Sequence, residues 1–504
     1  MSAPVAPHSS ELLSSVQRRL VLVGMMCGVS LAALDQMVLA TAVGTIAGEL
    51  GNIGQAPWIF TANLLTSASA MPIWGKLGDL YGRRRVFRIA ITLFVVASLL
   101  AAQSRTMPEL LVCRALQGLS GGALLTVPYA ILGDIVPPRE RPAYLAYISV
   151  VWTTAGFLGP PLGGLLVDGP GWRWMFYLNV PAAMVAFFLI GWGYRLPVQR
   201  IEHRIDVLGA ALLMGTVGSF ILYTSWAGEA LGWGSPAALA FLGASGLLGL
   251  AFVRQERRAA EPILALHLLG QRAVWPPLVA NFVFGLANMA IAIFVPLFSI
   301  AVLGTNAVAA GLTLAPLTAG ILLAGIVMGR RAARTGRFRR YTMGGFLVYA
   351  VGVTGLALAG PGTTRLAFGA CTLALGFGGG TIGAMVVSSL QSAVDARYIG
   401  VASSLPGFSR TIAQTIGTSA LGTFFAVRLG VHVERAVAPY AASAHDAQAL
   451  IDAPGAIRDL SEPLRGALVE AYRASFSESF VLMAAIILSA LVAARFMIDP
   501  DERR

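Results

Sequence analysis

The stretch GKLGDLYGRRRVF, residues 75–87, lies between two apolar segments and decides how the rest of the chain is interpreted. Gly75 and Gly82 permit a tight turn because glycine adopts backbone conformations that other residues avoid. Asp79 can cap a helix or pair with the arginines that follow it. The pattern predicts two membrane-spanning helices joined by a short, positively charged loop.

Composition supports a membrane protein. Of the 504 residues, 56% are hydrophobic and 12% are charged, whereas soluble domains contain roughly 25% charged residues. The net charge of +12 comes from arginines between apolar segments, which indicates membrane topology and not a nucleic-acid partner. Cys27, Cys113 and Cys371 lie within apolar segments. We therefore expect no disulfide framework, no metal and no cofactor.

A spanning helix needs about 20 mostly apolar residues, and windows of that size predict an all-α integral membrane fold with fourteen helices. They lie at 20–48, 57–76, 86–104, 109–134, 143–167, 174–195, 207–227, 236–254, 274–302, 308–329, 341–360, 364–390, 399–427 and 476–497. Most of the 36 basic residues fall in alternate loops. The positive-inside rule then predicts that both termini are cytoplasmic, in the cell inner (plasma) membrane.

An internal repeat predicts the domain organisation. MGRRAARTGRFRR, residues 328–340, places Gly and Arg in a second turn after the tenth span. Parallel halves of this kind form a known transporter plan with the substrate site between them. We expect an interfacial helix at 1–19, a six-helix bundle at 20–200, two additional helices at 201–260, a second bundle at 261–498 and a tail at 499–504. In the outer segment 428–475 we expect a helix lying on the surface, or else a solvated connector.

GKLGDLYGRRRVF resembles the loop between the second and third helices of the major facilitator superfamily. Gly75, Asp79, Gly82, Arg83 and Arg84 fall on its signature positions. The resemblance implies a cytoplasmic latch between the two halves. The alternative is an arginine-rich loop that serves topology alone.

Two further motifs resemble those of drug:proton antiporters in the same superfamily. LVCRALQGLSGGALL, residues 111–125, resembles the fourth-helix motif and contains Arg114. A buried arginine should pair with a carboxylate or line water, although it could instead snorkel to the interface. GFLGPPLGG resembles the fifth-helix motif of exporters, and its matching residues are Gly156, Gly159, Pro160, Gly163 and Gly164.

The fourteen-helix branch of these antiporters matches most of the chain, from about residue 20 to residue 497. WRWMFYLNVP (172–181), IDVLGAALL (205–213) and IGVASSLPGFSRTIAQTIGTSALGT (399–423) all resemble it. LDQMVLATAV resembles its first-helix motif, in which Asp35 is the characteristic acid. Burial disfavours a charged carboxylate and a nearby cation favours it, so we expect Asp35 and Arg114 to couple proton binding to transport. A static, structural ion pair is the alternative.

The resemblance implies a central cavity for an amphipathic substrate, in a protein expected to be a monomer. The candidate lining residues are polar, aromatic or Met side chains on predicted spans: Gln36, Met37, Trp58, Phe60, Asn63, Gln117, Trp152, Phe284, Asn288, Phe294, Gln391 and Arg410. Several positions depart from the usual pattern, namely Met37, Gly44, Asn63, Ile300 and Gln414. The pocket is therefore expected to differ from that of a typical multidrug member.

Three functions were weighed. The first is a proton-coupled exporter of cationic or amphipathic drugs. The second is an exporter of a native lipid, antibiotic or metabolite by the same mechanism. The third, a receptor or membrane enzyme, is disfavoured because the sequence shows no nucleophile–base pair, metal cluster or phosphate-binding glycine loop.

Overall fold

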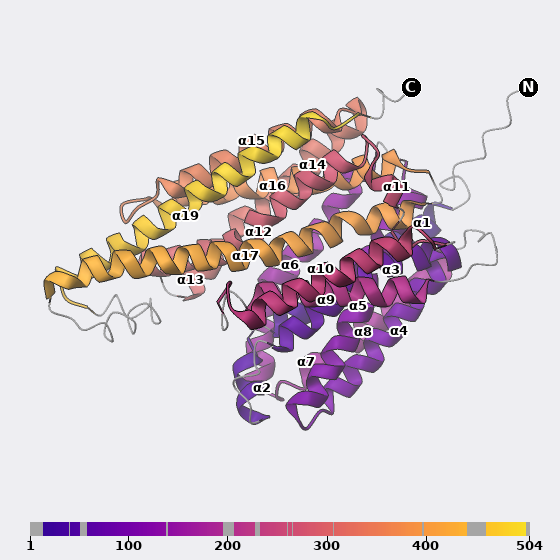
Figure 1. Ribbon diagram of the computed structural model, residues 1–504, viewed down its shortest axis with the longest axis horizontal. Helices are drawn as coiled ribbons and strands as arrows, with labels where there is room; N and C mark the ends of the chain where they lie inside the picture. Colours follow the sequence, from indigo (N-terminus) through magenta and orange to yellow (C-terminus); the bar gives the residue numbers. More distant parts are fainter. Residues whose placement is uncertain are drawn as a thin grey trace, which may run out of the picture.

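The computed structural model describes residues 14–39, 41–50, 58–137, 140–194, 206–226, 232–259, 261–264, 266–305, 307–395, 398–440 and 460–499. Within these ranges the regular structure is helical (Figure 1). The first half contains α1 (Ser15–Leu39), α2 (Val43–Glu49), α3 (Trp58–Tyr81), α4 (Arg83–Ala102), α5 (Met107–Ile135), α6 (Arg141–Asp168), α7 (Trp174–Tyr177) and α8 (Asn179–Gly193).

Two central helices follow, and then the second half of the chain. The central pair is α9 (Val207–Trp226) and α10 (Pro236–Glu256). The second half contains α11 (Leu266–Leu269), α12 (Trp275–Ala301), α13 (Ala307–Leu312), α14 (Ala315–Thr335), α15 (Phe338–Ala357), α16 (Arg365–Ala393), α17 (Ile399–Val437), the 3₁₀ turn η5 (Ala438–Tyr440) and α19 (Leu464–Arg495).

Twelve helices of the described chain are long and apolar enough to cross a membrane. This confirms an all-helical, multi-pass membrane fold but not the predicted count of fourteen. The two further predicted spans correspond to α3, with 24 residues, and α15, with 20 residues. Both contain polar or charged residues that lower their mean hydropathy, such as Asn63 in α3 and Arg339 in α15.

Local sequence signals explain where several helices begin and end. Thr106 and Thr364 cap α5 and α16, because each side chain accepts a hydrogen bond from the amide three residues later. Gly82 separates α3 from α4 with φ 85°, and Gly336 ends α14 with φ 65°. These positive φ angles favour glycine. Each of the two Gly-Arg turns of the sequence thus contains a glycine with positive φ between two helices.

The two halves meet at one end of the molecule, which we call the terminal end because α1 begins and α19 ends there. Gly329 at the end of α14 lies so close to Ala143 of α6 that an added Cβ would approach its Cα to 2.9 Å. Gly133 at the end of α5 likewise lies against Ile399, where α17 begins. Toward the opposite end, the distal end, the indigo and purple half diverges from the orange and yellow half (Figure 1).

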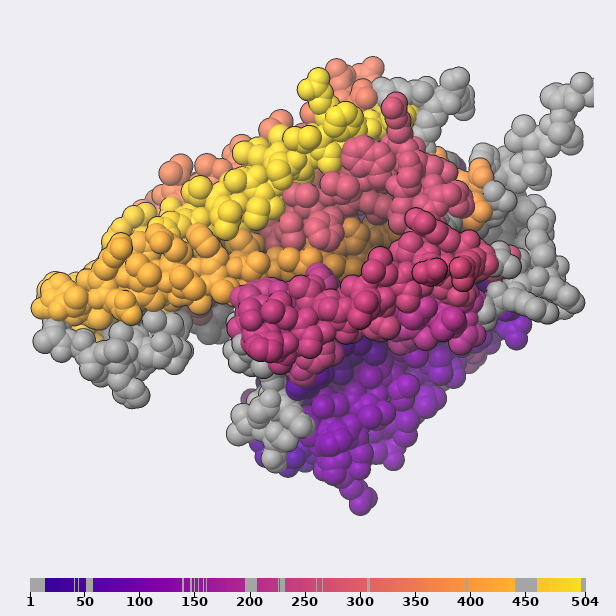
Figure 2. Space-filling model, in the orientation of Figure 1, coloured from indigo at the N-terminus to yellow at the C-terminus, as the bar shows by residue number. Residues whose placement is uncertain are grey.

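The central pair α9–α10 contacts both halves. Trp226 of α9 packs edge-on against Trp58 of α3 with ring centroids 5.1 Å apart. Beyond the end of α9, the indole of Trp233 donates a hydrogen bond to Thr423 of α17 at 3.3 Å. The magenta pair lies across the front of the molecule between the two halves (Figure 2).

The structure corrects two predictions about helix boundaries. Ser15–Arg19 are the first residues of the continuous helix α1 and not a separate interfacial helix, while residues 1–13 lie outside the described chain. In the segment 428–475, α17 extends to Val437 and α19 begins at Leu464. The predicted surface helix is therefore the distal part of α19, because Leu468 and Tyr472 are buried in the core.

The distal parts of α17 and α19 pack together. Phe425 and Phe476 have ring centroids 4.5 Å apart. Arg428 and His432 of α17 both contact the carboxylate of Glu478, at 2.7 Å and 3.2 Å. Glu478 thus lies well inside α19, and not at a helix end as its sequence position had indicated.

Candidate functional site

Asp35 and Arg114 form an ion pair inside the first half. The Arg114 Nη1 atom lies 2.6 Å from Oδ2 of Asp35. Arg114 is 0% exposed and Asp35 is 7% exposed, so Arg114 does not snorkel to the interface. A buried pair is retained only when further hydrogen bonds satisfy the desolvated groups, and this pair has several.

The polar network around Asp35 draws on four helices. Gln117 accepts a hydrogen bond from Arg114 at 2.8 Å and donates one to Ser98 of α4 at 2.7 Å. Asn179, the first residue of α8, donates to Asp35 Oδ1 at 2.9 Å. The backbone carbonyl of Ile59 accepts from Arg114 Nε at 3.2 Å, while Arg114 Nη2 is buried without a hydrogen-bond partner.

Ser98 and Asn179 were not predicted as site residues. Each is fully or almost fully buried, at 0% and 4% exposure. The sequence signal that could have identified them is the one that identified Asp35: a polar side chain within an apolar segment. Serine is common in spanning helices, so Ser98 was inconspicuous. Asn179 lies within the quoted motif WRWMFYLNVP, and its contact with α1 spans 144 residues of sequence.

Asp79 connects the halves at the terminal end. Its carboxylate accepts hydrogen bonds from the amides of Gly400 and Val401, at 2.8 Å and 3.1 Å, in the first turn of α17. An anion is favourable there because the unpaired amides carry the positive end of the helix dipole. Arg83 pairs with Asp79 at 3.0 Å and also with Asp134 at the end of α5.

The other residues of the loop motif, Gly75, Gly82 and Arg84, have different roles. Gly75 lies against the start of α17, since an added Cβ would approach the carbonyl oxygen of Gly400 to 2.7 Å. Gly82 provides the turn into α4. Arg84 points elsewhere and donates a hydrogen bond to the carbonyl of Gly191 in α8. The structure therefore brings Gly75, Asp79 and Arg83 to the contact between the halves, whereas Arg84 lies within the first half.

The GFLGPPLGG motif lies on α6, where two of its glycines pack against α1. An added Cβ at Gly159 would approach Cβ of Met37 to 2.4 Å, and one at Gly163 would approach Oγ1 of Thr41 to 2.2 Å. Gly156 and Gly164 have no atom within 4 Å of such a Cβ. These close contacts involve Met37 and Thr41, which come shortly after Asp35 in the sequence.

These glycines give a matched pair of substitutions. We expect Gly163→Ala to destabilise the protein by about 1–3 kcal/mol, because a methyl group would overlap α1. Gly164→Ala has open space and should change stability by less than about 0.5 kcal/mol. Thermal unfolding of the two purified variants in one detergent measures the difference. Equal melting temperatures would contradict the close α1–α6 packing.

Asn179 gives a second test. Its amide donates a hydrogen bond to the Asp35 carboxylate at 2.9 Å, so Asn179→Leu leaves this buried carboxylate with one donor fewer. We expect the variant to be less stable by about 1.5–3 kcal/mol, the range for a hydrogen bond to a charged group. Thermal unfolding of the purified variant, in the detergent used for wild type, measures the loss. An unchanged melting temperature would show that this hydrogen bond does not stabilise the network around Asp35.

The predicted cavity residues occupy several different environments. Trp58 packs against α9. Phe294 lies in the core of the second half against Phe425 and Phe476, and Phe284 is buried there beside Tyr349. Each of these three aromatic residues therefore packs against other rings, and their place in a cavity stays a prediction. Phe60 and Trp152 pack at the edges of the apolar clusters of the first half.

The remaining candidates, which are polar apart from Met37, lie in separate places. Gln117 and Asn63 belong to the region around Arg114, and Asn63 bonds the Arg114 carbonyl at 3.4 Å. Gln391 bonds the Tyr129 carbonyl at 2.7 Å and so joins α16 to α5. Asn288 accepts from Gln414 at 3.2 Å, while Gln36, Met37 and Arg410 are half-buried. The described part of the structure does not bring the Asp35 network into contact with the second-half residues Gln391, Asn288, Gln414 and Arg410.

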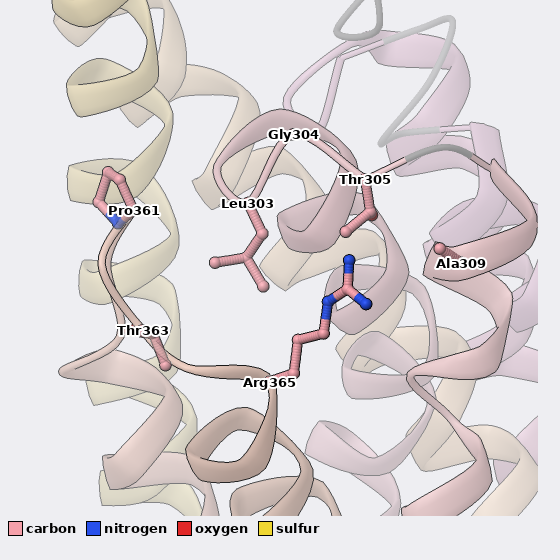
Figure 3. A pocket seen from close by; sticks show the side chains of 7 residues that line it. All are labelled: Leu303, Gly304, Thr305, Ala309, Pro361, Thr363 and Arg365. Atoms are coloured by element: carbon pink, nitrogen blue, oxygen red, sulfur yellow. The ribbon is translucent and has the colours of Figure 1, made fainter.

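A recess of about 410 Å³ lies elsewhere, at the distal end of the second half. It is lined by Leu303, Gly304, Thr305, Ala309, Pro361, Thr363 and Arg365, and the Arg365 side chain extends into it toward Thr305 (Figure 3). None of these residues belongs to the predicted cavity. The described residues contain no cluster of His, Cys, Asp and Glu suited to a metal ion.

Comparisons with known proteins agree with this architecture. The family model of the Major Facilitator Superfamily matches residues 25–418. An uncharacterized MFS-type transporter of Mycobacterium tuberculosis is 31% identical over 98% of this chain and 72% of its own. Multidrug resistance protein 3 of Bacillus subtilis is 29% identical over 80% of this chain and 79% of its own. The human organic anion transporter MFSD10 superposes with a TM-score of 0.60 at 14% identity, covering 94% and 99% of the two chains. The chain therefore belongs to the Major Facilitator Superfamily, a family of transporters and not of enzymes.

Proposed function

We propose that this transporter is a proton-coupled exporter of cationic or amphipathic compounds that works by alternating access. The observation that carries the proposal is the buried carboxylate of Asp35, which pairs with Arg114 at 2.6 Å and accepts hydrogen bonds from side chains of α5 and α8. An intramembrane carboxylate of this kind is a candidate proton site. Protonation and a cationic substrate both neutralise its charge, so they compete and exchange follows.

The closed terminal end and the diverging distal end suggest the step at which protons enter. Asp35 lies roughly 30 Å along α1 from its start, at a rise of 1.5 Å per residue, and so in the distal part of the helix. In the proposed cycle, Asp35 takes up a proton while the distal end is open. The halves then rock, the terminal end opens, and Arg114 favours proton release as substrate binds. The bonds between Asp79 and α17 stabilise the state in which the terminal end is closed.

The proposal includes a topology. We take α3 and α15 as spanning helices, which gives fourteen, and place the arginine-rich terminal end in the cytoplasm, with the protein in the cell inner (plasma) membrane. The proton gradient is the energy source, with no cofactor or metal, and the monomer is the working unit. The name of the Bacillus subtilis relative, a multidrug resistance protein, supports the substrate class. Gln36, Met37, Asn288 and Arg410 remain proposed contacts of the substrate, and we add Gln414 because it donates a hydrogen bond to Asn288.

The test is ethidium transport by purified protein in proteoliposomes under an imposed pH gradient. We expect dye to move against its own gradient and to stop when an ionophore collapses the pH difference. Dye transport that persists after collapse would contradict proton coupling. If folded protein moves no dye under any gradient, the proposed substrate class is wrong. Export of a native lipid, antibiotic or metabolite then becomes the proposed function.

A further inference from the structure

We infer that the surface along which α4 and α8 lie side by side, at the terminal end of the first half, binds the phosphate headgroup of an anionic phospholipid; we call this surface the α4–α8 groove. Three arginines in the first two turns of α4 define it: Arg84, Arg85 and Arg88. The two helices lie side by side at the periphery of the first half (Figure 1). This site is separate from the Asp35 network and from the residues proposed to bind substrate.

Two of the arginines are held against α8, in different ways. Arg84 donates to the carbonyl of Gly191. The Arg88 guanidinium lies over the ring of Phe187, with its Cζ 4.0 Å from the ring centroid, within the distance of a cation–π contact. Arg85 is exposed. The groove therefore has one arginine fixed by the backbone, one fixed by an aromatic ring and one that is free to move.

Charge complementarity identifies the occupant. Among the ion pairs between described residues, none involves Arg85 or Arg88. Within the same part of the chain, no residue accepts a hydrogen bond from the Arg88 guanidinium, and its Nε is buried without a partner. A guanidinium matches phosphate oxygens in geometry as well as charge. The groove thus offers uncompensated donors for a phosphate group.

The surroundings indicate a lipid and not a soluble anion. Beyond the arginines both helices expose apolar side chains: Ile89, Leu93 and Val96 of α4, and Val185, Phe188 and Trp192 of α8. Trp192 is 63% exposed, as is typical of tryptophan at a membrane interface. A phospholipid would place its headgroup on the arginines and its chains along these residues. Basic pockets between spanning helices on the cytoplasmic side bind anionic headgroups in this way.

Binding can be measured without transport, so the test is independent of the proposed function. Delipidated protein in detergent is titrated with phosphatidylglycerol, and bound lipid is counted by native mass spectrometry. We expect the double variant Arg85→Gln/Arg88→Gln to bind about 10-fold more weakly than wild type. Arg85→Gln alone should give an intermediate loss, and it keeps the Phe187 contact if the double variant folds poorly. Phosphatidylcholine of the same chain length should bind all variants alike.

The control is Arg331→Gln/Arg334→Gln, which removes two exposed arginines from the corresponding end of the second half. It should leave most phosphatidylglycerol binding intact. An equal loss in both double variants would show general attraction to a basic surface and would overturn the site. Inorganic phosphate at millimolar concentration should not displace the lipid. Displacement would show that the groove recognises a free anion and would overturn the lipid assignment.

Discussion

Asp35→Asn should strongly reduce uphill transport while leaving the protein folded. The amide has nearly the same shape as the carboxylate but cannot carry a proton on and off. Under an imposed pH gradient, dye accumulation in proteoliposomes should fall by about 10- to 100-fold, the range expected when a coupling free energy is removed. Exchange of labelled for unlabelled dye, which needs no net proton movement, should continue. The halves can still rock around a site whose charge is fixed.

The matched control is Glu49→Gln. Glu49 is an exposed carboxylate at the end of α2, paired with Arg173 at 2.6 Å, and it lies outside the Asp35 network. Hydrogen bonds from Arg173 and Trp172 hold the pKa of Glu49 below its usual range, so it stays ionised throughout the range of the assay. Glu49→Gln should therefore transport as wild type does. If Asp35→Asn also accumulates dye at the wild-type rate, Asp35 has a structural role and the proposed mechanism is wrong.

Asp79→Asn should open the terminal end. The substitution weakens the acceptor of two amides at the start of α17 and leaves Arg83 with Asp134 as its one acidic partner among the described residues. Hydrogen bonds to a charged group contribute about 1.5–3 kcal/mol, so the ratio of closed to open terminal ends should fall by about 10- to 100-fold. Net transport should fall too, because the cycle needs both states to be populated.

Spin labels at residues 81 and 334 can report the change. Tyr81, at the end of α3, is 38% exposed, and Arg334, near the end of α14, is exposed as well. The three native cysteines would first be replaced by alanine. Double electron–electron resonance should show a second, longer distance in Asp79→Asn. Glu470→Gln, which removes an exposed carboxylate paired with Arg473, should leave the distribution unchanged. A wild-type distribution in Asp79→Asn would mean that these bonds do not hold the halves together.

The sequence was informative where a side chain conflicts with its surroundings. A carboxylate and an arginine within apolar segments, and a Gly-Arg turn between two of them, were each conspicuous, and the structure places Asp35 and Arg114 in contact. The partners of Asp79 could not be predicted because they are backbone amides more than 300 residues away. The aromatic candidates were uncertain for another reason. A phenylalanine such as Phe294 suits a bundle core as well as a cavity wall, and hydropathy does not distinguish the two.

Helix boundaries in the second half show a related limit. Hydropathy marks the part of a helix that lies in lipid, so it placed the ends of α17 and α19 where polar residues begin. The helices continue because Arg428, His432 and Glu478 satisfy one another between them. Without these partners, the polar residues after position 427 predicted a separate surface helix or a solvated connector.

The length of α17 has a practical consequence. Its 39 residues extend about 58 Å at 1.5 Å per residue, whereas a hydrocarbon core is about 30 Å thick. With 28 residues, α6 of the first half is far shorter. At the distal end, α17 and α19 therefore extend further than the helices of the first half, and ion pairs and contacts between aromatic rings join them there. This pair of helices is a natural epitope for a nanobody. A bound nanobody would mark the second half in particle images.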